Sequence, residues 1–516
     1  MPPKQPEPDS AGKTASKAGS LASKSSVRLW GSVYSWSDKL TEFLLYAMII
    51  FSSWALGATD NWSVWTLNIS AYVLGLLLVL KTTSLGVSKI SPPRWEGGPD
   101  TPPSGRRWMK FIFFLNVVLL IYIIVGALNN RATFVVQERR FIYHDALPWL
   151  PHSYDRGSSL FVFWYILGLS CVFWSARDWL LGRSVADAIQ EPGNHAPAVP
   201  SRLRRLLWVL TLNGALLAIE GILQRLEGSG RLLFLVKPYW NRTAGEQFGP
   251  WAYRANAAQY FNLIWPVAIG FWLWLAADDE RPRGRRSRVG SNPRTILLPL
   301  AVLMAACPII SSSRGGAIID ALLSLTTIFF VVIFRRKRSF FSRIAIPTTL
   351  AAGFALGMYF GWDALKPRLE EMLQGETSSR QLLYRNARQM TRDFYVLGSG
   401  AGTFGSLYQL YRSDPEQDWE AYAHNDWLEA LITLGVVGET IIVLAFLSLL
   451  KRSLTREGIR APGVFYAFIL LSIAGCLIHA TFDFPLQVYS ILFVFILLCS
   501  TLSSFGKSTA SRMAAS

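Results

Sequence analysis

Twelve apolar stretches follow one another along the chain, separated by short polar connections. Six lie in the first half, near residues 41–58, 64–81, 110–128, 158–176, 205–223 and 257–277. Six more lie near residues 295–312, 315–334, 344–361, 428–450, 463–482 and 487–505. Each has about the 17 to 25 residues that a helix needs to cross a bilayer. The pattern therefore predicts an all-α polytopic membrane protein with about 12 transmembrane helices.

The longest polar interruption late in the chain runs from Trp362 to Asn425, between the ninth and tenth apolar stretches. From Gln381 to Phe394, apolar residues recur at helical spacing on one face, and three arginines occupy the opposite face. The apolar positions are Leu383, Ala387, Met390 and Phe394, and the basic ones are Arg385, Arg388 and Arg392. We expect a helix whose basic side faces water or lipid-linked anions.

Composition and charge support a membrane protein. Hydrophobic residues make up 51% of the chain and charged residues 16%, and the formal net charge is +17. If the N-terminus is cytoplasmic, 34 of the 51 Lys and Arg residues fall on the cytoplasmic side. The bias is clearest in short loops such as 281–294 and 335–343, as expected for the positive-inside rule. The charge therefore indicates topology, with both termini cytoplasmic, and no nucleic-acid partner.

The same pattern suggests how the chain is divided. We expect a disordered cytoplasmic tail over residues 1–40, because Pro, Ser, Ala and Lys dominate there and no cleavable signal peptide is visible. Transmembrane helices fill residues 41–295, a functional region spans 296–490 with its loop at 362–425, and residues 491–516 end the last helix and form a tail. The four cysteines lie inside apolar runs, which excludes a disulfide framework.

His424 stands where the long loop meets a membrane helix, a suitable position for a general base. Asp426 or Glu429 is placed to orient its ring, although a lone histidine is more often a helix-terminus or hydrogen-bonding residue. His479 and Asp483 share a helix face, which favours a local hydrogen-bonded pair. No cluster offers three or four ligands at metal-binding spacing, so we expect no metal site.

Two further stretches carry candidate chemistry. Arg314 lies in the short turn Ser311–Gly316, where it either snorkels to the interface or holds a phosphate. The segment Leu397–Phe404 reads LGSGAGTF. No strand precedes it, so we reject a dinucleotide fingerprint and expect a glycine-rich turn whose backbone N–H groups face an anion.

Taken in order, these motifs resemble the bacterial family of O-antigen ligases and related polymerases. The resemblance rests on SSSRGG at Ser311–Gly316, on TSSR at 377–380 followed by LGSGAGTF, and on AHNDWLEALITLGVVGE at 423–439. The segment HATFDFPLQ at 479–487 is similar to a further family segment. A family Asn-Arg-Asn segment is replaced here by Tyr253, Arg254, Ala255 and Asn256.

The resemblance implies transfer of a glycan from undecaprenyl diphosphate on the periplasmic face of the bacterial cytoplasmic membrane. It implies an inverting, metal-independent enzyme that needs no cofactor and works among membrane lipids. Carried over by position, His424 matches the family's general base. Arg314 and Arg380 match the arginines that bind the diphosphate, and Arg385 is added to them. The acceptor is the lipid A core in a ligase, or another glycan in a polymerase.

Two readings from other classes compete with an enzyme. A polysaccharide exporter or flippase would have its functional residues near the bilayer midplane, and no internal repeat of helices is apparent. A non-catalytic assembly scaffold would use the long loop only to bind a partner. The order of the loop motifs favours the enzyme.

Overall fold

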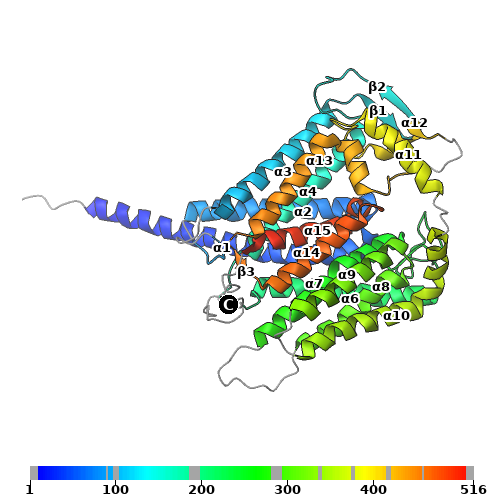
Figure 1. Cartoon of the computed structure of the whole chain (residues 1–516). Helices are drawn as coiled ribbons and strands as arrows, with labels where there is room; N and C mark the ends of the chain where they lie inside the picture. Colours follow the sequence, from blue (N-terminus) through cyan, green and yellow to red (C-terminus); the bar gives the residue numbers. More distant parts are fainter. Residues whose placement is uncertain are drawn as a thin grey trace, which may run out of the picture.

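A computed structural model shows a predominantly helical protein (Figure 1). It describes residues 10–88, 91–96, 104–184, 187, 198–279, 293–334, 340–373, 378–413, 420–455 and 458–506, with only the backbone at 10–27 and at some helix ends. Most of the basic connections 281–294 and 335–343 lie outside these residues. Within them, eight helices are long and apolar enough to cross a membrane. The mostly helical membrane architecture is confirmed, and the number of spans stays a prediction.

Every expected apolar stretch coincides with a helix. The first set comprises α1 Ser10–Trp54, η1 Leu56–Ala58, α2 Asn61–Ser88, α3 Ser104–Leu128, α4 Arg156–Leu180, α6 Ser201–Glu227 and α7 Arg254–Asp279. The second comprises η2 Pro293–Ile296, α8 Leu297–Ile310, α9 Arg314–Phe334, α10 Phe340–Leu373, α11 Ser378–Asp393, α12 Phe404–Tyr411, α13 Asp426–Ser453, α14 Gly463–His479, η3 Pro485–Gln487 and α15 Tyr489–Ser504.

The strands are short. β1 Ala132–Val135 pairs antiparallel with β2 Arg140–Tyr143 in the connection between α3 and α4. β3 Ile459–Arg460 pairs parallel with β4 Phe505–Gly506 and ties the start of α14 to the end of α15. Neither pair builds a core, so helix packing determines the fold.

Two boundaries differ from the sequence expectation. α1 begins at Ser10, so residues 10–40 are helical where we expected a disordered tail. Pro8 is the last proline before this helix, and the Ala, Lys, Leu and Ser residues that follow are compatible with a helix. α10 continues to Leu373, eleven residues past Trp362, because Leu365 is buried and Lys366 pairs with Glu370 one turn later. The long loop is therefore shorter than expected.

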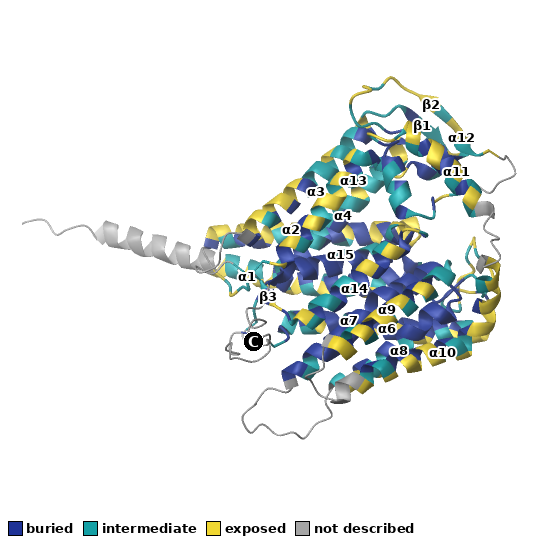
Figure 2. Ribbon diagram, viewed as in Figure 1, coloured by how far each residue is buried: buried dark blue, intermediate teal, exposed yellow. Residues whose placement is uncertain are grey.

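α7 is the central helix of the bundle (Figure 2). Its hydrophobic window is 94% buried, against 22 to 61% for the other candidate spans. It packs against α6, α8, α9, α14 and α15. The contact with α14 is close because a Cβ added to Gly270 would lie 2.8 Å from the Phe468 Cβ. Residues at the N-terminus of α7 are consequently fixed in position.

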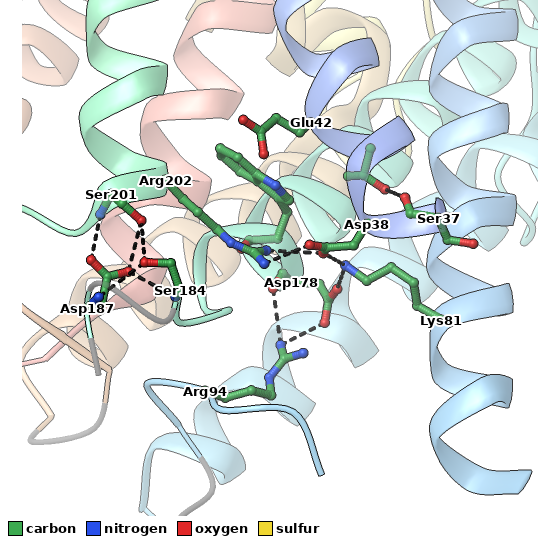
Figure 3. Close-up of polar contacts among 12 residues, drawn as sticks. Ser37, Asp38, Glu42, Lys81, Arg94, Asp178, Ser184, Asp187, Ser201 and Arg202 are labelled. Carbon is green, nitrogen blue, oxygen red and sulfur yellow. Dashed lines mark hydrogen bonds and ion pairs between the residues drawn. The ribbon is translucent and has the colours of Figure 1, made fainter. Parts of the chain in front are cut away.

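The bundle has two ends, which we name by the elements found there. At the α11 end, the N-termini of α7, α9 and α13 lie with α11, α12 and the β1–β2 pair. At the β3 end, buried ion pairs join α1, α2, α4 and α6 (Figure 3). There the Lys81 ammonium lies 2.7 Å from Asp38 and 2.6 Å from Asp178, and Arg202 and Arg94 pair with the same two carboxylates.

Candidate functional site

His424 occupies a strained position at the N-terminus of α13. Its φ is +48°, in the left-handed region that non-glycine residues rarely adopt. Such strain costs about 1 to 3 kcal/mol and persists only where neighbours enforce it. Here the Tyr384 hydroxyl donates to the His424 carbonyl oxygen at 3.0 Å. Asn425 caps α13 by accepting from the Leu428 N–H. The imidazole is therefore fixed at the entrance to the helix.

Asp483 orients the imidazole of His424. Its Oδ1 lies 3.2 Å from Nδ1 of His424, and its side chain is only 7% exposed. Burial alone would raise the pKa of Asp483, but the hydrogen bond from His424 and the charges of His479 and Arg380 hold it below the usual value. An ionised Asp483 accepts the Nδ1 proton, which leaves the Nε2 lone pair free to take a proton.

Tyr253 is the second partner of Asp483. Its hydroxyl donates to Oδ2 at 3.1 Å. Burial, helped by the negative charge of Asp483, raises the pKa of Tyr253 well above its ordinary value, so the group stays a donor. The Tyr253 ring stacks on Phe484 at 5.3 Å, and Phe484 stacks on Tyr422 at 4.3 Å. His424 meets the Phe484 ring edge-on at 4.9 Å. Aromatic packing thus fixes the site from one side.

Arg380 lies beside Asp483, at the start of α11. Its Nη1 donates to the Phe482 carbonyl oxygen at 3.0 Å. Among the described residues, no carboxylate forms an ion pair with this guanidinium. Its positive charge reaches the site, because it contributes to lowering the pKa of Asp483.

Arg314 is the first residue of α9. Its Nη1 donates to the Arg368 carbonyl oxygen at 3.2 Å and lies 4.0 Å from the Glu371 carboxylate, which is 54% exposed. Gly315, next to Arg314, lies against the Phe482 ring, and Arg380 donates to the Phe482 carbonyl oxygen. Both arginines expected from the sequence therefore lie near Phe482, the residue before Asp483.

The glycines after Arg314 allow α9 to approach this region. A Cβ on Gly315 would lie 2.5 Å from a Phe482 ring carbon, and one on Gly316 would lie 2.2 Å from the Ala258 Cβ. The preceding serines are buried, and the Ser313 hydroxyl accepts from the Gly316 N–H at 3.1 Å. Side chains larger than glycine would push the N-terminus of α9 away from α7 and from the segment that contains Asp483.

Asp426 and Glu429 do not orient the imidazole, as we had expected either to do. The Asp426 carboxylate accepts from the Leu486 N–H at 2.9 Å, and the Glu429 carboxylate accepts from the Ala423 N–H at 2.9 Å. Both side chains point along the start of α13 into the protein, where they fix the backbone on either side of the site. The ring itself is held from the α14–η3 turn.

His479 and Asp483 lie close together, as expected, but their side chains do not form a hydrogen bond. The Asp483 N–H donates to the His479 carbonyl oxygen at 3.1 Å, and His479 Nε2 lies 4.0 Å from Asp483 Oδ2, beyond hydrogen-bond distance. The Nδ1 atom of His479 instead lies 2.7 Å from Gln259 Oε1 on α7. The Asp483 carboxylate is thereby available to His424.

α11 has the expected amphipathic form but does not bring Arg385 to the site. Leu383, Ala387 and Met390 are buried, whereas the three arginines are exposed. Arg380 and Tyr384, four residues apart, share the side of α11 that faces His424. Arg385 lies on the exposed side. We therefore exclude Arg385 from the site, because the helical period turns it away.

The glycine-rich turn stabilises the structure instead of binding an anion. Gly398, Gly400 and Gly402 have positive φ angles, and α13 breaks at Gly435, whose φ is +65°. The N–H groups of Ser399 and Gly400 donate to the Ile432 and Thr433 carbonyl oxygens freed by that break, at 2.9 and 3.0 Å. The expected exposure of this turn to an anion is therefore wrong for these two groups.

Sequence reasoning missed the two partners that complete the site. Asp483 lies 59 residues from His424, and Tyr253 lies 230 residues from Asp483. The available signals were the HATFDFPLQ segment and the departure from the family's Asn-Arg-Asn segment at Tyr253. Among the described residues, no group of three or more His, Cys, Asp or Glu side chains is placed to hold a metal ion.

Comparison with known families agrees with the motifs. Residues 299–443 match the family model described as O-Antigen ligase, and no curated protein matches the chain. The matched segment runs from α8 to α13 and includes Arg314, Arg380 and His424, whereas Tyr253 and Asp483 lie outside it. The chain is therefore a multi-pass membrane protein in which residues 299–443 are similar to the O-antigen ligase family.

Proposed function

We propose that the protein is a membrane glycosyltransferase of the O-antigen ligase type. It would transfer a glycan from an undecaprenyl-diphosphate carrier to a hydroxyl of lipid A core or of another glycan, on the periplasmic face of the inner membrane. The observation that supports this most directly is the hydrogen bond between His424 and Asp483, flanked by Arg380 and Arg314. A base and two cations at one helix-bundle end suit the displacement of a lipid diphosphate.

The proposed reaction is a single displacement. The Nε2 lone pair of His424 takes the proton of the acceptor hydroxyl as its oxygen forms a bond to the anomeric carbon. The bond between that carbon and the phosphate oxygen breaks, and the electron pair leaves on the lipid diphosphate. Asp483 stabilises the imidazolium that results, as a carboxylate does in other aspartate–histidine pairs. Configuration at the anomeric carbon inverts because only one displacement occurs.

Arg314 and Arg380 would supply the electrostatic part of the mechanism. Negative charge grows on the diphosphate as the bond breaks, and fixed cations stabilise it more in the transition state than in the bound donor. Arg314 has only the half-exposed Glu371 carboxylate at 4.0 Å, and no ion pair is formed by Arg380 among the described residues, so most of their charge is available. We propose that these arginines take the place of a divalent metal.

The test of the base is transfer by purified protein with a lipid-linked glycan donor and a matching acceptor. His424→Ala should lower the rate by about 10² to 10⁴, the range that a positioned general base contributes. His144→Ala is the matched control, because His144 is exposed at the same end and its ring forms a hydrogen bond with Thr133, away from the site. A folded His424→Ala protein with the parent rate would refute this role.

Ligase and polymerase activities differ in the acceptor. Deletion of the gene followed by gel and mass spectrometry of surface polysaccharide separates them. Loss of glycan from lipid A core identifies a ligase, and shortened lipid-linked or secreted chains identify a polymerase. Loss of surface glycan with lipid-linked precursors trapped on the cytoplasmic side would favour an exporter.

A further inference from the structure

The connection between α6 and α7 presents apolar side chains to the surroundings. We name residues 232–242 the α6–α7 loop. Leu235, Tyr239 and Trp240 are 78, 74 and 75% exposed, and Val236 beside them is 41% exposed. Single exposed apolar residues need no explanation, but a contiguous group of this size marks a contact surface. A loop surrounded by water would not expose such a group of apolar side chains unless another surface covered them.

The loop is held rigidly at its base. Leu232 and Val236 exchange backbone hydrogen bonds at 2.8 and 3.0 Å, which closes the first turn. The buried Gln224 side chain donates to the Arg231 carbonyl oxygen, and the buried Gln247 side chain donates to the Gly230 and Asn241 carbonyl oxygens. The exposed side chains are therefore displayed on a fixed frame.

The frame also contains backbone strain. Leu233, Phe234 and Asn241 have φ angles of 51°, 64° and 53°, in the left-handed region. Each such residue costs about 1 to 3 kcal/mol. The hydrogen bonds of the buried glutamines therefore impose this conformation against the backbone φ/ψ preferences of the loop residues. In this conformation the apolar side chains are exposed.

Cations surround the exposed apolar group. Arg231, Lys237 and Arg242 are exposed, and the Arg242 guanidinium lies 5.7 Å from the Tyr239 ring centre while its Nε donates to the Tyr239 carbonyl oxygen. Residues 232–242 contain no Asp or Glu, and the neighbouring acids Glu227 and Glu246 lie outside the loop. The loop therefore carries net positive charge around aromatic side chains, a composition that suits the headgroup region of a membrane.

The position of the loop agrees with that environment. α6 ends at Glu227 and α7 begins at Arg254, and both helices are candidate membrane spans. The loop thus leaves the bundle where the hydrocarbon core gives way to headgroups. We infer that the α6–α7 loop seats its apolar side chains at the boundary between headgroups and acyl chains of the adjacent leaflet, with its cations against anionic phospholipids. This inference does not depend on the proposed transfer reaction.

The test uses the full-length protein in lipid nanodiscs with a fluorescent bimane label at one cysteine. The four native cysteines are first replaced by serine. Trp240→Cys and Leu235→Cys report on the loop, and Glu138→Cys in the β1–β2 turn, 54% exposed at the same end, is the matched control. Lipids with a nitroxide near the headgroup should quench both loop labels at least about two-fold more than the control label. Aqueous iodide should show the opposite order.

The lipid charge is varied in a second set of nanodiscs, made with phosphatidylglycerol or with phosphatidylcholine alone. Nitroxide quenching at Trp240→Cys should be greater with phosphatidylglycerol, and Lys237→Gln with Arg242→Gln should remove that difference. Iodide quenching equal to that of Glu138→Cys would overturn the inference, since the loop would then lie in water. Protection from both quenchers would also overturn it, because a protein surface such as a second copy would then cover the loop.

Discussion

Basic side chains are paired with carboxylates at one end of the helix bundle and mostly with backbone carbonyl groups at the other. At the β3 end, Lys81, Arg94 and Arg202 each have a carboxylate oxygen within 2.7 Å (Figure 3). At the α11 end, Arg380 donates to a backbone carbonyl, and the one carboxylate that pairs with Arg314 within the part of the chain that the structure describes is 4.0 Å away and half exposed. The first arrangement neutralises its cations, and the second leaves them available.

The difference shows where function is to be sought. Buried ion pairs such as these, in which three cations share two carboxylates, hold helices in register, and breaking one of them is destabilising. Cations that bond only to carbonyl oxygens keep their net charge and can still attract an anion. The account therefore assigns stability to the β3 end and chemistry to the α11 end, and variants at each end should separate these two properties.

The largest expected effect is at the β3 end. Lys81→Met should destabilise the protein by about 3 kcal/mol, the low end of the range for a broken buried pair, because Asp38 and Asp178 each keep one arginine. Thermal unfolding in detergent measures the loss. The rate of transfer per folded molecule should stay unchanged. Lys366→Met is the control, since Lys366 is more than half exposed. Equal melting temperatures of the two variants would contradict a structural role for the ion pairs at the β3 end.

The next effect concerns the shape of the cations at the α11 end. Arg380→Lys and Arg314→Lys retain the positive charge but lose the planar guanidinium group, which can form two hydrogen bonds with one phosphate. The loss of a charge-assisted hydrogen bond, about 1.5 to 3 kcal/mol, corresponds to a rate lower by about ten- to a hundred-fold. Arg385→Lys is the control on the exposed face of α11. EDTA should leave the parent rate unchanged, and a requirement for Mg²⁺ or Mn²⁺ would contradict the proposed role.

A smaller effect is expected at the orienting carboxylate. Asp483→Asn retains the shape of the side chain but removes the charge that fixes the histidine tautomer. Replacing the carboxylate partner of a metal-bound histidine lowers activity by about ten- to a hundred-fold, and we expect a loss of that size here. Asp393→Asn, an exposed carboxylate that accepts from Tyr411 at the same end, is the control. Rates measured at saturating donor would show whether kcat falls, and a change in KM alone would argue against orientation of the base.

The smallest effect is expected for Tyr253→Phe, which removes one of the hydrogen bonds to the ionised Asp483 and keeps the ring stacked on Phe484. A hydrogen bond to a charged group contributes about 1.5 to 3 kcal/mol, but Asp483 keeps its charge and its bond to His424, so the rate should fall by only about two- to ten-fold. Tyr384→Phe is a comparison variant, because its hydroxyl bonds the His424 backbone and not the carboxylate. A loss as large as that of Asp483→Asn would mean that Tyr253 acts directly on substrate.

The helices and the position of His424 were accessible from sequence because they depend on local pattern. Apolar runs specify helices, and the amphipathic period of α11 placed Leu383, Ala387 and Met390 inside correctly. The four-residue spacing correctly placed His479 near Asp483, with their side chains 4.0 Å apart, but it could not show that the carboxylate bonds a second histidine. No local signal indicated that Asp483 would turn toward a residue 59 positions earlier.

The central claim is that His424 and Asp483 act as one unit, and a double-mutant cycle tests it most directly. Transfer rates are measured for the parent, His424→Ala, Asp483→Asn and the double variant, each purified and shown to be folded. Residues that act as a unit are strongly non-additive. The account predicts that Asp483→Asn has no further effect once His424 is alanine. Fully additive losses in the double variant would contradict it.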